Sequence, residues 1–288
     1  MRRAALPALA TALLAACGST VDGDEGASAD ASPADASPGE PDDGACVTPP
    51  GSTSGKLVRL VYLVPSDREV DPVRLANLEH AFTDVRLWLR ARMPQRTSFL
   101  AHEPLVEVVK TDHTEEHYRT TPNGDNPYYY FWQNAVADAS AALGVMGDDP
   151  DNVWLIYADA DVGCDQFGGG WIRNVALGSA ADIRGLAQES QAPACPDHPT
   201  APGPRCDYVG SMGNLLLGAL GVPFPPGCAD EDETTECDAE RLIWLGRYEY
   251  PDGATLGPED IEYLSDNPFM RAIGLPDCQL DCTAPVAP

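Results

Sequence analysis

The chain has 288 residues and a formal net charge of −27, with 45 acidic and only 18 basic side chains. This acidic balance argues against partners such as nucleic acid or anionic lipid, which bind basic surfaces. The length is sufficient for one sizeable hydrophobic core.

The first residues have the composition of an export signal. Two arginines precede an apolar run, Ala4 to Leu13, that is too short to span a bilayer as a permanent helix. The next four residues, Leu14-Ala-Ala-Cys17, resemble the lipobox of bacterial lipoproteins, in which the signal is cut before a Cys that becomes acylated. The resemblance implies a signal peptide at 1–16 and a lipid anchor on Cys17 in the bacterial cell envelope. The small residues after the Cys favour the outer membrane. The alternative is an ordinary secretory signal.

A polar linker and one folded domain are expected after the signal. Residues 17–45 are almost entirely Asp, Glu, Ala, Ser, Pro and Gly, which leaves no apolar surface to bury and predicts a disordered tether. Residues 46–283 are expected to form a single domain. Its upper lobe covers about 56–221, and a small, irregular lobe rich in Pro and Cys covers about 222–283.

Strand and helix patterns alternate along the upper lobe. They predict an α+β fold of the three-layer α/β type, with a mixed, mostly parallel sheet of four or five strands. A Gly-rich loop is expected at 168–170. Strands are expected at 57–64, 105–109, 152–158 and 174–179, the last at the sheet edge, and helices at 72–93, 128–143 and 207–220.

The segment from Asn214 to Phe224 has the spacing of a zinc-protease site without its chemistry. Such a site needs two His one helical turn apart, with a Glu after the first, and a Gly that ends the helix before a third His. Gly221 occupies that Gly position, but the three ligand positions hold Asn214, Gly218 and Phe224. Leu215 stands where the general base belongs. We therefore expect neither a metal, nor a cofactor, nor catalysis at this helix.

Several segments resemble the metzincin clan of zinc metalloproteases, in a secreted bacterial branch. Tyr62–Arg68 resembles their opening strand, Leu242–Asp252 the segment with the Met-turn, and Leu256–Phe269 the closing helix. In that alignment Ile243 replaces the Met beneath the zinc. The resemblance implies a metzincin-like fold that holds peptides as an added strand along the sheet edge. The chain departs from the family at all three ligands, the base and the Met.

A missing metal leaves space that the protein must fill. We expect the Phe224 ring to pack over Gly218 and near Asn214, with Leu215 completing an apolar patch. The preferred interpretation is therefore a cell-envelope lipoprotein with a catalytically inactive metalloprotease-like domain. It would bind a peptide, protein or other surface ligand in the former active-site cleft.

Two other groups could hold a cation. His113-Thr-Glu-Glu-His117 fits the inverted His-x-x-Glu-His zinc pattern, so an active zinc-dependent hydrolase using His113 and His117 is the alternative function. The segment follows a strand and runs into turn residues, which predicts a polar surface loop instead. Asp159, Asp161 and Asp165 lack the spacing of a calcium loop and are expected to be solvated acids.

Eight of the nine Cys remain after the lipidated one. An even number in an exported chain implies up to four disulfides, and no Cys-x2-Cys pair supports the alternative of a Cys-built zinc site. Sequence alone does not fix the connectivity. The pairs we expect are Cys195–Cys206, Cys228–Cys237, and Cys46 with either Cys278 or Cys282.

Overall fold

The computed structural model describes residues 51–190, 203–228, 237–275, 278, 280–283 and 285–287. These residues belong to one compact unit, Gly44–Pro288, and the expected signal peptide, Cys17 and tether lie outside them. Within these ranges, no helix has both the length and the apolar character needed to cross a bilayer.

The central sheet has five strands in the order β3-β1-β4-β6-β5. The first four run parallel, and β5 pairs antiparallel to β6. Nearly all side chains of β1 and β4 are buried, as expected for parallel strands covered on both faces. The strands are β1 (Leu57–Val64), β3 (Ala101–Lys110), β4 (Asn152–Ala158), β5 (Gly170–Ile172) and β6 (Val175–Gly178), with a separate antiparallel pair of β2 (Thr97–Phe99) and β7 (Met270–Ala272).

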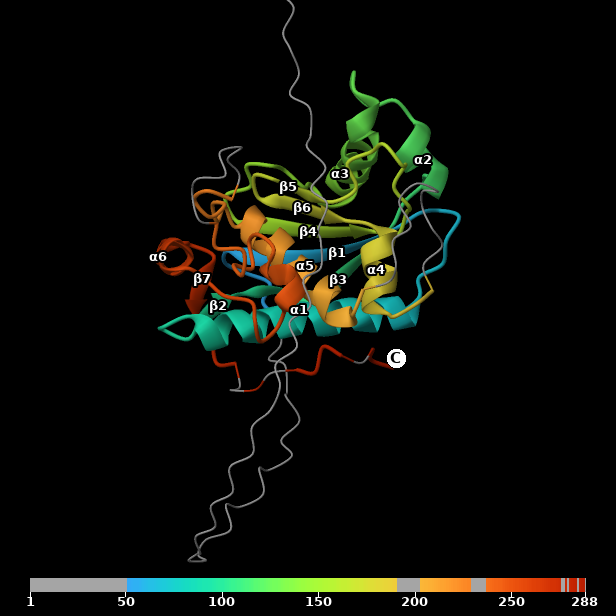
Figure 1. The fold of residues 1–288 in the computed structure, drawn as a ribbon. Helices are drawn as coiled ribbons and strands as arrows, with labels where there is room; N and C mark the ends of the chain where they lie inside the picture. Colours follow the sequence, from blue (N-terminus) through green and yellow to red (C-terminus); the bar gives the residue numbers. More distant parts are fainter. Residues whose placement is uncertain are drawn as a thin grey trace, which may run out of the picture. The chain divides into compact units, whose positions relative to one another are not determined.

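Helices cover the two faces of this sheet (Figure 1). Helices α1, α4 and α5 pack on one face in a core that includes Leu60 and Tyr62, and α3 packs on the other face with Val61 and Leu63. The helices are α1 (Pro72–Arg92), α2 (Glu115–Thr120), α3 (Tyr130–Leu143), α4 (Ala180–Leu186), α5 (Arg205–Ala219) and α6 (Pro258–Asp266), with two 3₁₀ turns, η1 (Pro127–Tyr129) and η2 (Gly246–Glu249). The three-layer α/β architecture predicted from the sequence is confirmed.

Local sequence explains where the main elements begin. The Asp71 side chain caps α1 by accepting hydrogen bonds from the backbone N–H groups of Val73 (2.8 Å) and Arg74 (3.3 Å). Pro72 occupies the first helical position, where its missing N–H has no cost. The strands expected at 57–64 and 152–158 have the predicted bounds.

The edge of the sheet differs from the prediction. The strand expected at 174–179 is β6, and it lies inside the sheet between β4 and β5. The chain turns at Arg173, whose backbone has a positive φ of 55°, so that Gly170–Ile172 runs back alongside β6. The segment predicted as a Gly-rich loop thus ends in β5, the edge strand.

The disulfides confirm one expected pair and correct others. Cys228–Cys237 is present, as local loop closure predicted. Cys206 bonds Cys282, so the expected Cys195–Cys206 pair and the Cys46–Cys282 option are both wrong. The longer link joins the first turn of α5 to the C-terminal segment, across a sequence separation of 76 residues. Cys164 and Cys278 are also disulfide-bonded, whereas Cys46 and Cys195 lie outside the described residues.

Candidate functional site

Helix α5 ends as the metzincin resemblance implies. Gly221 follows it with a φ of +88°, in the left-handed region that favours Gly, and its N–H donates to the Gly218 carbonyl (2.9 Å). A Cβ at Gly221 would overlap the Tyr263 hydroxyl. The turn that would carry a third ligand back toward the helix is therefore intact.

The first ligand position, Asn214, has a structural role. Its side-chain amide donates to the carbonyl oxygens of Leu242 (3.0 Å) and Trp244 (3.4 Å) in the segment that resembles the Met-turn. The same face of α5 includes Gly210, where a Cβ would overlap the carbonyl of Arg247. Close backbone approach and the Asn214 amide together hold this segment against the helix.

The second ligand position is covered by a ring that the sequence analysis did not consider. A Cβ at Gly218 would overlap the ring of Trp171 from strand β5. The Phe224 ring instead lies 5.4 Å from the Trp171 ring and 5.1 Å from the Trp244 ring, centroid to centroid, and Phe224 is 43% exposed. The expectation that Phe224 covers Gly218 is therefore wrong. Trp171, which has a larger ring than Phe224 and lies on the neighbouring strand β5, occupies the space beside Gly218.

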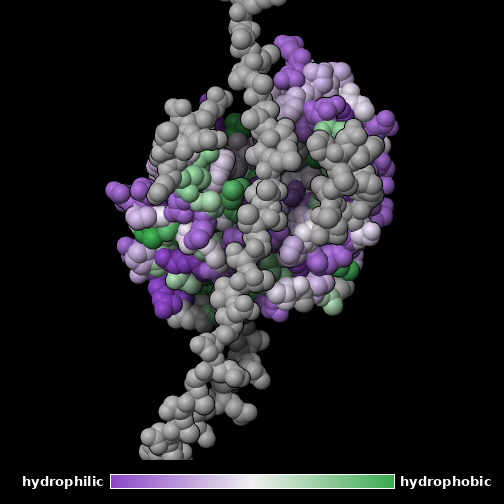
Figure 2. Space-filling model, viewed as in Figure 1, coloured by the Kyte–Doolittle hydropathy of each residue, from purple (hydrophilic) through white to green (hydrophobic). Residues whose placement is uncertain are grey.

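A cleft of about 530 Å³ opens beside these three rings. We call it the α5 cleft; its lining includes Trp171, Asn214, Leu215, Phe224, Ile243 and Trp244. Leu215 and Ile243 are largely buried, so hydrocarbon occupies the base and Met positions. Figure 2 shows hydrophobic residues interspersed with hydrophilic ones on the face of the domain seen in Figure 1.

Two charged side chains add polarity to the α5 cleft. Asp182 lies at the start of α4, where its carboxylate accepts from the backbone N–H (2.7 Å) and hydroxyl (3.0 Å) of Ser179. Desolvation among the packed protein atoms raises the pKa of Asp182. Arg247 also lines the cleft, and its buried Nε has no hydrogen-bond partner among the described residues. The cleft therefore combines an aromatic wall with one acidic and one basic group.

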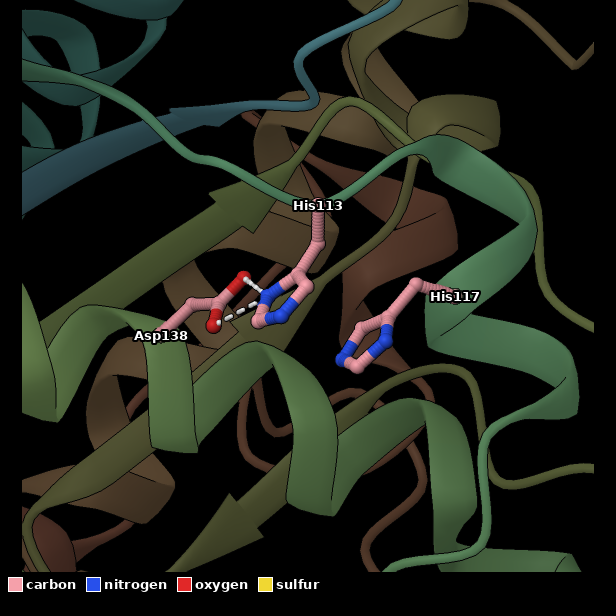
Figure 3. A group of neighbouring side chains, drawn as sticks. All are labelled: His113, His117 and Asp138. Carbon is pink, nitrogen blue, oxygen red and sulfur yellow. Dashed lines mark hydrogen bonds and ion pairs between the residues drawn. The ribbon is translucent and has the colours of Figure 1, made fainter.

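The inverted zinc motif lies elsewhere and does not form the expected polar loop. Thr114 precedes α2, so His113 and His117 lie at its N-terminal end, and their rings stack with centroids 3.7 Å apart. Asp138 of α3 accepts a hydrogen bond from His113 Nδ1 at 2.9 Å. Figure 3 shows the His113 ring between Asp138 and His117. We call these three residues the α2–α3 corner.

The α2–α3 corner is partly shielded from solvent and linked by hydrogen bonds, as expected for metal ligands. Asp138 is mostly buried and also accepts from the Tyr118 hydroxyl (2.8 Å), which lies 2.9 Å from the Thr111 hydroxyl. Desolvation, followed by the nearby His113, lowers the pKa of His117. Among the described residues, this is the one group of three His, Cys, Asp or Glu side chains with ligand atoms mutually within 4.8 Å.

The loop acids after β4 form ion pairs. Asp159 is buried and accepts from the Tyr62 hydroxyl (2.7 Å) and from Arg74 (2.9 Å), and Asp161 pairs with Arg184. The expectation that these acids are solvated is wrong for Asp159, whereas Asp161 is paired with arginine but remains 27% exposed. Asp165 is exposed, as expected.

In sequence, no protein-family model and no curated protein matches the chain. Among solved structures, two crystal forms of wild-type OgpA from Akkermansia muciniphila match with 17% and 18% identity and TM-scores of 0.49 and 0.47. Each match covers 79% of this chain and 65% of the OgpA chain, so this chain spans less than two thirds of OgpA. Archaemetzincin from Methanopyrus kandleri matches with 13% identity and a TM-score of 0.36, over 73% of this chain and 94% of that chain. Similarity at this level assigns no activity to the chain.

Sequence reasoning missed three of the residues that shape these sites. Trp171 stands one residue after a triple Gly, and a short edge strand following a Gly-rich loop was the available signal. Asp138 is a lone acid in an Ala-rich helix and gives no sequence signal of its partners. Asp182 follows Ser179 at capping-box spacing, which does predict the start of α4.

Proposed function

We propose that the chain is an envelope lipoprotein whose metzincin-like domain is catalytically inactive and binds an extended peptide or protein segment in the α5 cleft. One observation carries this proposal. The positions that would ligate zinc hold an amide engaged with backbone, a Gly covered by Trp171, and the phenyl ring of Phe224. Carbon and an amide already bound to carbonyls cannot replace three imidazoles.

Strand β5 supplies a binding edge beside that cleft. It pairs with β6 on one side, and on its other side it has no strand partner among the described residues. Gly169, Gly170 and Trp171 also line the cleft. An extended peptide would add to this edge through backbone hydrogen bonds, with apolar side chains on the aromatic wall. Asp182 and Arg247 would bind its polar groups.

Binding of peptides selected from a random-sequence phage library tests this proposal. Synthetic copies of selected peptides would be titrated against the purified chain by tryptophan fluorescence, since Trp171 and Trp244 lie in the cleft. Phe224→Ala should weaken binding about tenfold, because a ring contact contributes on the order of 1 kcal/mol beyond the apolar area that it buries. Tyr263→Ala, an equally exposed aromatic on α6, is the matched control. Equal affinity in the Phe224 variant and the wild type would contradict cleft binding.

The anchoring part of the proposal has its own test. The Leu14–Cys17 segment and the polar tether support attachment through lipid on Cys17. Cys17→Ser should move the protein from the membrane fraction to the soluble fraction of the cell envelope. A variant that is processed normally and stays in the membrane fraction would disprove the lipoprotein assignment.

The alternative, an active zinc hydrolase, is favoured by the proximity of His113, His117 and Asp138. In the inverted pattern Glu116 takes the place of the general base. A fluorescent casein assay with added zinc, and with chelator, distinguishes the two functions. We expect no metal-dependent cleavage. Cleavage that disappears in Glu116→Gln would replace the binding proposal with the hydrolase.

A further inference from the structure

The α2–α3 corner brings three metal-binding side chains together from α2, from the segment just before it and from α3. His117 lies on α2, His113 lies two residues before that helix begins, and Asp138 lies on α3, 21 positions after His117. Imidazole nitrogen and carboxylate oxygen are the ligand types of zinc sites with three protein ligands and an open position for water. The packing of α2 against α3 brings these side chains together.

The distances are close to those of a zinc site. Ligands about 2.1 Å from a tetrahedral zinc lie roughly 3.4 Å from one another. His113 Nδ1 and Asp138 Oδ1 are already 2.9 Å apart, and the ligand atoms of all three residues lie mutually within 4.8 Å. A metal would replace the proton that His113 and Asp138 now share, and a rotation of the stacked His117 ring would direct its nitrogen to the same point.

The surroundings hold the carboxylate in place for this role. The Tyr118 hydroxyl donates to Asp138 Oδ2, and both oxygens of this carboxylate face His113 Nδ1, Oδ1 at 2.9 Å and Oδ2 at 3.1 Å. Hydrogen bonds of this kind orient ligands in established metal sites. A surface hollow of about 280 Å³, lined in part by His113 and Asp138, gives a metal ion and its water ligands access from solvent.

We propose that the α2–α3 corner is a binding site for one zinc-class divalent transition-metal ion, ligated by His113, His117 and Asp138. The site is independent of the peptide-binding function proposed for the α5 cleft, and it requires no catalysis. The α5 cleft and the corner lie on opposite faces of the sheet, which separates their effects in experiments.

Zinc titration of the purified full chain, freed of metal by chelator, tests the proposal. A competing zinc indicator would report the affinity in the wild type, His117→Gln and Asp138→Asn. His102→Ala is the matched control, since His102 pairs with Glu107 outside the corner. We expect about one zinc per chain in the wild type and the control, and at least tenfold weaker binding in the two corner variants. His117→Gln keeps a side chain of similar size, and thermal unfolding would check that both variants fold.

Cobalt substitution provides a second measurement. Co²⁺ bound to three protein ligands and water should produce visible absorption typical of a four-coordinate ion, and the band should be lost in His117→Gln. No zinc binding by the wild type, or equal zinc affinity in the wild type and the folded His117→Gln variant, would overturn the proposal.

Discussion

The α5 cleft and the α2–α3 corner differ in what they provide: the cleft has a well-supported backbone frame without metal-binding side chains, and the corner has metal-binding side chains without such a frame. The α5 cleft has a helix, a Gly turn and a segment packed against that helix, but the Trp171 ring covers Gly218 and the Phe224 ring packs against Trp171. The α2–α3 corner has three donor side chains, which come from the six-residue helix α2, the segment just before it and α3, and it lacks such a supporting frame. Backbone architecture and ligand chemistry are thus separable within one chain.

The difference lies in how each region is held. Helix α5 is fixed by the Cys206–Cys282 bond, by the Asn214 amide and by close Gly contacts. The corner depends on hydrogen bonds among Thr111, Tyr118 and Asp138. We therefore expect stability to depend more on the α5 region, and metal affinity to depend only on the corner.

Removing the long disulfide should have the largest effect. Replacing both Cys206 and Cys282 with Ser should lower the free energy of unfolding by about 4 kcal/mol, since the bond closes a loop of 76 residues. The same change at Cys228 and Cys237, which close a loop of 9 residues, should cost only about 2–3 kcal/mol. Urea unfolding measures both. An equal or smaller loss for the longer loop would mean that α5 is not held mainly by this bond.

Adding one methyl group at Gly218 should cause the next-largest loss of stability. Gly218→Ala forces the Trp171 ring off the helix and should destabilise the fold by about 1–3 kcal/mol. Gly147→Ala is the control, because its new methyl group meets only ordinary contact with Arg173. Trp171→Ala in the Gly218→Ala background should recover part of the loss. If Gly218→Ala matched the wild type in unfolding, Trp171 would not be the residue that fills this position.

Removing the Asn214 amide should lower the free energy of unfolding by a similar or slightly smaller amount. Asn214→Ala leaves the carbonyls of Leu242 and Trp244 without this donor and should cost about 1–2 kcal/mol. Asn214→Asp keeps the shape but sets a carboxylate against two carbonyl oxygens, so its loss should be larger. Thermal unfolding compares them. If the Asp variant proved the more stable of the two, the hydrogen-bonding role of Asn214 would be refuted.

The smallest effect is expected at Tyr118. Tyr118→Phe removes the hydrogen bond to Asp138 and should cost about 1 kcal/mol of stability. Its zinc affinity should fall about tenfold, because Asp138 is then less well oriented. Zinc titration beside Phe131→Leu, a nearby core change, separates orientation from general loosening. A zinc affinity lowered equally in both variants would argue against a specific role for the Tyr118 hydroxyl.

Much of the fold could be predicted because strands buried on both faces and helices with one buried face leave recognisable apolar patterns in the sequence. The apolar runs at 57–64 and 152–158 predicted β1 and β4, and the Gly at 221 predicted the end of α5. Strand β5 was missed because three residues after a Gly-rich loop have no measurable period. Its pairing depends on the turn at Arg173, which depends on the tertiary fold.

The sites were less predictable because they also depend on how separate elements pack together. The positions of Asn214, Gly218 and Phe224 on one helix and the turn after it could be predicted from their spacing. The residues that now fill the space come from other elements, as Trp171 does from β5. Asp138 reaches His113 only because α2 packs on α3, so the motif alone suggested a surface loop.

The position of bound zinc tests the central claim most directly. Crystals of the full chain soaked in zinc would be measured on both sides of the zinc absorption edge, and the anomalous difference map locates the metal without assumption. We expect a peak between His113, His117 and Asp138, and none beside Asn214, Gly218 and Phe224. A peak in the α5 cleft would contradict the claim that this helix has lost its metal chemistry.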